Sequence, residues 1–126
     1  MVKTIIIVDD EKDIRTILRQ AIEATRDWNV LEAENGAVGL ELIRREIPDA
    51  VLLDVMMPKV DGREVFRILR QHEATGSIPV IFITAILQKR DLILLEALGP
   101  IAILPKPFDP IGIVNDISKL LKWDSD

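Results

Sequence analysis

Five short apolar runs alternate with longer segments of helical period along the chain, and this alternation restricts the possible fold more than any other feature. The runs are rich in Ile, Val and Leu and nearly continuous in their hydrophobicity, which is typical of parallel strands covered on both faces. Between them, apolar residues recur every three or four positions, as in amphipathic helices. We therefore predict five βα units, with strands at Thr4–Val8, Asn29–Ala33, Ala50–Asp54, Val80–Thr84 and Ile101–Leu104.

Proline, glycine and capping residues fall at the expected ends of the helical segments. Pro48 closes the second segment, Gly99 and Pro100 end the fourth, and Asp109 with Pro110 offers an N-cap followed by proline at the first helical position. Strand–helix–strand units joined by right-handed crossovers form an α/β fold, an open doubly wound parallel sheet with helices on both faces. The length of 126 residues predicts a single domain, residues 1–126.

Composition and charge exclude several functional classes. The chain contains no Cys, so it has neither a disulfide framework nor thiol chemistry. Its formal charge of -5 leaves no basic stripe for a nucleic-acid backbone. The apolar runs are too short for a membrane span or a signal-peptide core. We therefore expect a cytoplasmic protein without a membrane or direct nucleic-acid partner.

Polar side chains end or follow four of the five predicted strands. Asp9 and Asp10 end the first, Asp54 the third and Thr84 the fourth, and Lys106 follows the fifth. Ligands of open α/β sheets bind beyond the carboxyl ends of the strands, so these residues are expected to meet in one crevice. Three carboxylates repel one another unless a cation lies among them, and Mg²⁺ prefers such oxygen ligands. Lys106 and Thr84 suit phosphoryl oxygens, which leaves Asp54 as the nucleophile of an aspartyl phosphate.

Motifs around these residues occur in a fixed order over essentially the whole chain. They are Val8-Asp9-Asp10-Glu11, Leu52-Leu53-Asp54-Val55-Met56-Met57-Pro58, Asp61-Gly62, Thr84-Ala85 and Lys106-Pro107-Phe108. Each motif is weak alone, but together they resemble the response-regulator receiver domains of two-component signalling. The resemblance implies a flavodoxin-like strand order of 2-1-3-4-5.

The resemblance also implies roles for individual residues. A sensor histidine kinase or a phosphotransfer protein would donate the phosphoryl group to Asp54, with Thr84 and Lys106 assisting. Mg²⁺ would bind Asp10 and Asp54 directly, Asp9 through water, and the backbone carbonyl of Met56. A cis peptide bond would join Lys106 to Pro107. Such a protein is not an enzyme, apart from catalysing its own phosphorylation and dephosphorylation. We expect a stand-alone receiver domain, although a fragment of a larger regulator has the same sequence features.

A partner surface is expected on the fourth helical segment. Leu92–Leu95 occupy four successive positions about 100° apart, so at least one of these side chains points outward. Receivers commonly bind partners or form homodimers through the fourth helix, fifth strand and fifth helix. Ile103 and Ile111 would extend that apolar face. Ile103 also replaces the aromatic switch residue that receivers usually carry on the fifth strand.

Two other functions stay open at this point. An interaction module of receiver shape that is never phosphorylated remains possible because Ile103 replaces the aromatic residue. A magnesium-dependent aspartyl-phosphate phosphatase of the haloacid dehalogenase type needs a second Asp two residues after the nucleophile, where this chain has Met56. The remaining notable residues are interpreted as structural, namely Asp61 as an N-cap, His72 as a surface residue, and Trp28 and Trp123 as packing anchors.

Two apolar residues bear on the lifetime of the phosphorylated form. Met56 and Ile86 occupy the positions that flank the path of the attacking water in receivers, two residues after the acceptor Asp and two after the Thr. Neither side chain can orient a water for in-line attack, and both are expected to shield the phosphoryl group. We therefore expect a long-lived phospho-Asp54.

Overall fold

The computed structural model describes residues 2–86 and 88–123. Five parallel strands form one sheet in the order β2-β1-β3-β4-β5, which confirms the predicted α/β class and strand order. The strands are β1 (Thr4–Val8), β2 (Asn29–Ala33), β3 (Ala50–Asp54), β4 (Val80–Thr84) and β5 (Ala102–Pro105).

The fifth strand begins and ends one residue later than predicted, at Ala102 and Pro105. Ile101 donates its backbone N–H to the carbonyl of Val80, but its side chain is exposed and the paired register starts at Ala102. The apolar character of Ile101 therefore reflects a surface position, which a run of hydrophobic letters cannot distinguish from a buried strand residue. The other four strands have the predicted bounds.

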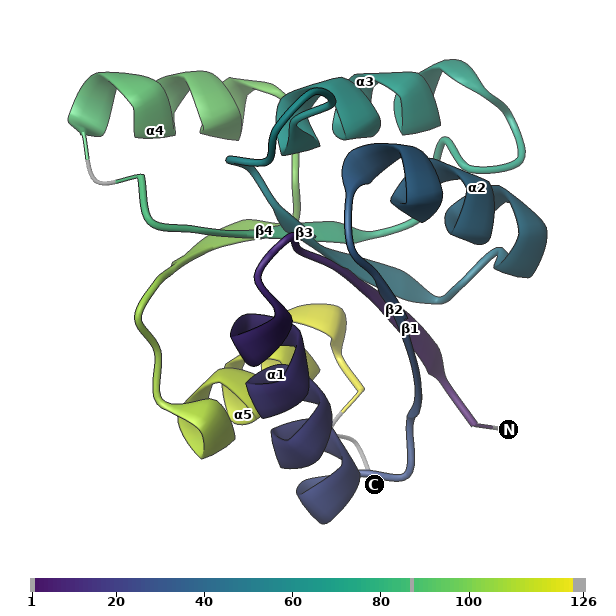
Figure 1. The fold of residues 1–126 in the computed structure, drawn as a ribbon, viewed down its shortest axis with the longest axis vertical. Helices are drawn as coiled ribbons and strands as arrows, with labels where there is room; N and C mark the ends of the chain where they lie inside the picture. The colour runs from purple at the N-terminus through teal and green to yellow at the C-terminus, as the bar shows by residue number, and fades with distance from the viewer. Residues whose placement is uncertain (1, 87, 124–126) are drawn as a thin grey trace.

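Five helices cover the two faces of the sheet. Figure 1 shows α1 and α5 on one side and α2, α3 and α4 on the other, as the doubly wound prediction requires. The helices are α1 (Lys12–Thr25), α2 (Gly36–Glu46), α3 (Gly62–Gln71), α4 (Lys89–Ala97) and α5 (Pro110–Leu121). Asp61 and Asp109 accept hydrogen bonds from backbone N–H groups of the first turns of α3 and α5, which confirms both predicted N-caps.

Alternate strand residues supply two separate hydrophobic cores. One core joins Ile6, Val8 and Leu53 to side chains of α2, α3 and α4, and the other joins Ile5 and Ile7 to side chains of α1 and α5. Successive strand side chains point to opposite faces, so a sheet covered on both sides needs the continuous apolar runs found in the sequence.

Trp28 and Trp123 pack edge to face with ring centroids 4.9 Å apart, which confirms their role as anchors, and His72 is exposed at the end of α3. Among the described residues, none of the helices is both long enough and apolar enough to cross a bilayer.

Candidate functional site

The polar residues singled out in the sequence lie at one edge of the sheet. Asp54 and Thr84 are the last residues of β3 and β4, Asp9 directly follows β1, and Lys106 directly follows β5. These four strands are consecutive neighbours in the sheet and run parallel, so their carboxyl ends open onto the same crevice.

Four carboxyl groups meet in this crevice. Within the described part of the chain, each offers an oxygen that lies within 4.8 Å of the others, and they belong to Asp9, Asp10, Glu11 and Asp54. Asp9 and Asp54 are buried, whereas Asp10 and Glu11 are exposed at the mouth. Sequence reasoning assigned no role to Glu11, although its place directly after the Asp9-Asp10 pair was the available signal.

The Lys106 ammonium lies among these carboxylates. Its Nζ is 2.9 Å from Asp9 Oδ2, 2.9 Å from Glu11 Oε1 and 3.4 Å from Asp54 Oδ1, and only 9% of its side chain is exposed. The Lys106 N–H also donates to the carbonyl of Thr84 at 2.9 Å, which ties the loop after β5 to the end of β4. The expected cis peptide bond between Lys106 and Pro107 is present.

Burial and mutual repulsion change how the buried carboxyl groups ionise. Burial, followed by the negative charge of Asp9, raises the pKa of Asp54 from 3.8 to about 7, although Lys106 acts in the opposite direction. Burial likewise raises the pKa of Asp9, against the hydrogen bond from Lys106. Burial opposes the charged form of Lys106, but hydrogen bonds to Asp9 and Glu11 outweigh it and raise the pKa of the ammonium. A single lysine therefore does not offset the cluster, and a further cation would stabilise it.

The backbone around Asp54 leaves little space. The N–H of Gly62, the first residue of α3, donates to the Val55 carbonyl at 2.8 Å. A Cβ atom at residue 62 would lie 2.2 Å from the carbonyl oxygen of Asp54, so only glycine lets α3 approach the end of β3 this closely. The Asp61-Gly62 motif thus caps α3 and lets it pack directly behind Asp54.

Thr84 is buried beside the crevice. Its side chain does not contact the Lys106 ammonium, which pairs with Asp9, Glu11 and Asp54. Its Oγ1 accepts a hydrogen bond from the Ile86 N–H at 3.1 Å, so its hydroxyl hydrogen remains free to be donated elsewhere. On its other side, Thr84 lines a groove of about 460 Å³ between α4 and β5, together with Ile86, Leu92 and Ile103.

The two adjacent methionines in the loop after Asp54 lie in different environments. Met57 is buried in the core beneath α2 and α3, whereas the side chain of Met56 is 61% exposed. Met56 therefore lies at the surface beside the crevice rather than in the core. The metal contact expected for its backbone carbonyl stays a prediction.

Helix α4 presents the predicted apolar surface. Leu95 is buried, but Ile93 and Leu94 are more than half exposed, which confirms that the four successive apolar residues cannot all face the core. Ile111 at the start of α5 is also exposed, whereas Ile103 is partly buried on β5.

Comparisons with known proteins agree with this arrangement. The sequence profile of the response regulator receiver domain matches residues 5–118. The chain is 35% identical over 122 residues to the alkaline phosphatase synthesis transcriptional regulatory protein PhoP of Bacillus subtilis, covering 97% of this chain and 50% of that protein. It is 37% identical over 118 residues to the transcriptional regulatory protein CpxR of Escherichia coli, covering 94% and 49%.

A solved structure agrees as well. The receiver domain of the Francisella response regulator 1452 superposes with a TM-score of 0.85 at 26% identity, covering 98% of this chain and 99% of that one. In contrast to this full-length match, the chain spans about half the length of the curated relatives.

Proposed function

This chain belongs to the response regulator receiver domain family, and we propose that it accepts a phosphoryl group on Asp54 with Mg²⁺ and thereby changes its affinity for a protein partner. The observation that carries the proposal is the position of the Asp54 carboxylate. It is 96% buried at the end of β3, faces the Lys106 ammonium, and shares its crevice with three other carboxyl groups.

The donor set fits magnesium. Mg²⁺ prefers oxygen ligands and binds through one or two carboxylates together with water and substrate phosphate. The cluster offers only carboxylate oxygens, both buried and exposed, and two of its members have raised pKa values that a neighbouring cation would lower. We assign Asp10 and Asp54 as direct ligands, Asp9 as a ligand through water, and the Met56 carbonyl as the remaining protein contact. When bound, Mg²⁺ supplies positive charge to the carboxylates and to the phosphoryl oxygens.

The proposed reaction transfers a phosphoryl group from a phosphohistidine of a sensor kinase or phosphotransfer protein. An oxygen of the ionised Asp54 carboxylate attacks phosphorus, an O–P bond forms, and the P–N bond to the donor imidazole breaks with its electron pair left on nitrogen. Because the carboxylate ends a buried strand, its oxygen is held in place before the donor arrives.

Lys106 and Thr84 act on the transferred group. Lys106 already lies 3.4 Å from Asp54, so its ammonium can move from Asp9 and Glu11 to a new phosphoryl oxygen with little displacement. Thr84 can donate its free hydroxyl hydrogen to another oxygen. If the Thr84 side chain turns toward this oxygen, its Oγ1 moves relative to the Ile86 N–H and the groove between α4 and β5 changes shape, which would link the site to the apolar surface of α4.

Labelling by a small phosphodonor tests the proposal. The protein is incubated with acetyl phosphate, with and without Mg²⁺, and the intact mass and the modified peptide are measured. We expect labelling of wild type only with Mg²⁺ and none of Asp54→Asn. Asp61→Asn is the matched control, because Asn is also a good N-cap and this carboxylate lies outside the cluster. It should be labelled like wild type.

Each other outcome contradicts the proposal in a different way. Labelling of Asp54→Asn at the wild-type rate would move the acceptor to another residue. An unlabelled wild type that still binds its partner would favour an interaction module that phosphorylation does not regulate. Sustained release of phosphate from added phosphomonoesters would favour a phosphatase.

A further inference from the structure

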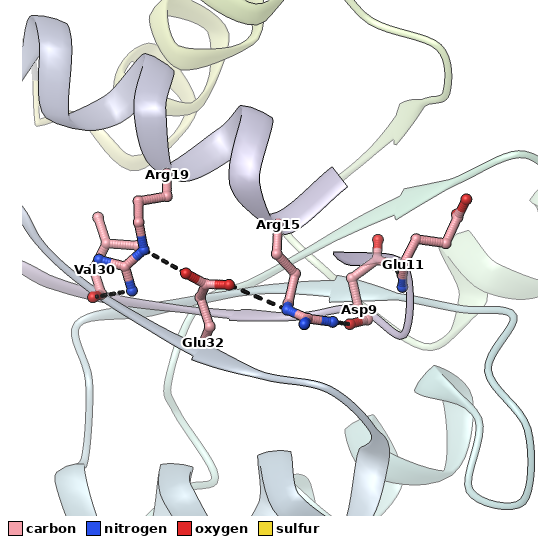
Figure 2. A network of polar contacts seen from close by, with 6 residues as sticks. All are labelled: Asp9, Glu11, Arg15, Arg19, Val30 and Glu32. Carbon is pink, nitrogen blue, oxygen red and sulfur yellow. Dashed lines mark hydrogen bonds and ion pairs between the residues drawn. The ribbon is translucent and has the colours of Figure 1, made fainter. Parts of the chain in front are cut away.

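An ion-pair network joins α1 and β2 to the first residue of the acidic cluster, and it contains a contact that the proposed function does not use. Figure 2 shows Glu32 of β2 between two arginines of α1. Arg15 Nε donates to Glu32 Oε1 at 3.1 Å, and Arg19 Nε donates to Glu32 Oε2. The pKa of Glu32 is lowered because these ion pairs outweigh the effect of its burial, so Glu32 is a carboxylate at neutral pH.

The two arginines share this partner but differ in the rest of their contacts. Arg15 donates from its terminal nitrogen to the backbone carbonyl of Asp9 at 2.7 Å (Figure 2). Arg19 instead donates to the carbonyl of Val30 at 3.0 Å and pairs with Glu23 at 3.0 Å. Arg15 is also the more enclosed, with 14% of its side chain exposed against 33% for Arg19. Only Arg15 of the two thus contacts a residue of the acidic cluster.

The contact from Arg15 holds the backbone carbonyl of Asp9, whereas the other bonds of this residue involve its N–H and its carboxylate. Its N–H already donates to Ala33 at 3.1 Å, and its carboxylate accepts from the Glu11 N–H and contacts Lys106. The carbonyl is the atom that leads on to Asp10. Because a peptide unit is planar, fixing this carbonyl also fixes the direction of the Asp10 N–H.

Asp10 gains most from this restraint. Its side chain is exposed, so few packing contacts orient it, and its position depends on the backbone that precedes it. An arginine donating to a carbonyl forms a charge-assisted hydrogen bond, which is shorter and stronger than a neutral one. Glu32 in turn fixes the plane of the guanidinium.

We propose that Arg15, oriented by Glu32, is a positioning residue for the metal-binding carboxylates, because its bond to the Asp9 carbonyl sets the direction of the Asp9–Asp10 backbone. This inference rests on the proposed magnesium site. Outer contacts of this kind typically change metal affinity by about 10-fold to 100-fold when they are removed. Arg15 acts through backbone, so we expect the lower end of that range.

Electrostatics alone predicts the opposite change in Mg²⁺ affinity when Arg15 is replaced, and this difference makes the inference testable. Arg15 brings a positive charge close to a site for a cation, so removing that charge should strengthen Mg²⁺ binding by electrostatics. Loss of positioning should weaken it. A weaker site in Arg15→Gln can therefore not be explained by the change in charge.

The experiment measures Mg²⁺ affinity of the unphosphorylated protein, from backbone amide shifts during titration with magnesium chloride and with no phosphodonor present. Arg15→Gln should bind about tenfold more weakly than wild type. Arg19→Gln is the matched control, since it lies on the same helix, removes the same charge and also breaks a bond to Glu32. It should bind as wild type or slightly more tightly. Urea unfolding of each variant separates loss of stability from loss of affinity.

Two further variants complete the design. Arg15→Lys keeps the charge and one donor, and should recover part of the lost affinity. Glu32→Gln keeps Arg15 but loses the carboxylate that orients it, and it should weaken binding less than Arg15→Gln does. Because the loss of a negative charge also weakens cation binding, the decisive result for this variant is an affinity equal to or tighter than that of wild type, which would contradict the positioning role even if Arg15→Gln does not fold.

The outcomes separate the two levels of the argument. If wild type does not bind Mg²⁺, the proposed function is wrong. If wild type binds and both Arg15→Gln and Glu32→Gln bind equally well or more tightly, the positioning role is wrong. The same conclusion follows if Arg19→Gln weakens binding as much as Arg15→Gln, because the network would then act only through stability.

Discussion

The acidic crevice and the α4 side of the sheet lie next to each other but are held together by different forces. At the crevice, the Asp9 carboxylate and the Lys106 ammonium form an ion pair at 2.9 Å with both side chains enclosed, and every residue of β3 is buried. On the α4 side, only Leu95 of the nine helical residues is fully buried, and β5 is partly exposed throughout.

This difference indicates which region is fixed and which can change. Polar bonds with strict geometry hold the crevice, so a group bound there meets preplaced charges. Few buried contacts anchor α4, and regions with few such contacts open at the lowest free-energy cost. Thr84 belongs to both regions, since it ends β4 beside Asp54 and also lines the α4–β5 groove. A change at the crevice can therefore be read out on the α4 surface.

The largest effect is expected from removing the single buried anchor of α4. Leu95→Ala should lower the free energy of unfolding by about 2–5 kcal/mol, the usual range for a fully buried leucine. Leu94→Ala, one position along and more than half exposed, should change it by less than about 0.5 kcal/mol. Urea denaturation measures both. Similar losses in the two variants would mean that α4 is not anchored by one residue.

A pH-dependent change in stability should arise from the crevice. Because burial raises the pKa of Asp54 from 3.8 to about 7, the folded protein keeps a proton that the unfolded chain releases between these values. Without divalent cations, stability should be greatest below pH 3.8 as far as this group is concerned, and should fall as the pH rises to about 7. Asp54→Asn should reduce this slope, and added Mg²⁺ should restore stability at neutral pH. An equal slope in wild type and Asp54→Asn would contradict this account.

A smaller effect concerns the lifetime of the phosphorylated form. Met56 and Ile86 carry apolar side chains at the rim, although Met56 is mostly exposed and so shields less than an enclosed residue would. Replacing them with polar residues in a Met56→Asn and Ile86→Glu double variant should speed loss of the phosphoryl group by about tenfold or less, equivalent to about 1.4 kcal/mol of barrier. The decay rate is measured in magnesium at one pH. Equal or slower decay of the double variant would show that the backbone alone positions the water.

The smallest effect on stability, yet a clear one on association, is expected at the outward side of α4. Ile93→Glu and Leu94→Glu should leave the free energy of unfolding within about 0.5 kcal/mol of wild type, since both side chains are exposed. Binding to a partner or to a second copy through this face should weaken. Exposed Ile17 on α1 is the control position. If Ile93→Glu and Leu94→Glu change neither binding to a partner nor self-association, the exposed residues of α4 are not a docking surface.

Much of the fold and of the candidate site could be predicted from the sequence. The alternation of apolar runs and helical periods gave the α/β class, because parallel strands covered on both faces must be apolar throughout. The placement of Asp9, Asp54 and Lys106 at strand ends followed from that class, since parallel strands share one carboxyl edge. The strand order came from family resemblance alone. The predicted start of β5 was wrong by one residue, because the exposed Ile101 is as apolar as a buried strand residue and the sequence alone does not distinguish the two.

The sequence by itself determined local matters, namely which segments are strands, which residues cap helices and which side chains end the strands. These depend on neighbours within a few positions of the chain. Only the tertiary structure decided that Lys106 contacts Glu11, that Thr84 lines a groove beneath α4, and that Arg15 rather than Arg19 bonds to the carbonyl of Asp9. Lys106 and Glu11 are 95 positions apart in the chain. Arg15 and Asp9 are only six apart, but their contact depends on how α1 packs beside the sheet. Whether such contacts form depends on distances of a few tenths of an ångström that strand and helix packing set and no local pattern encodes.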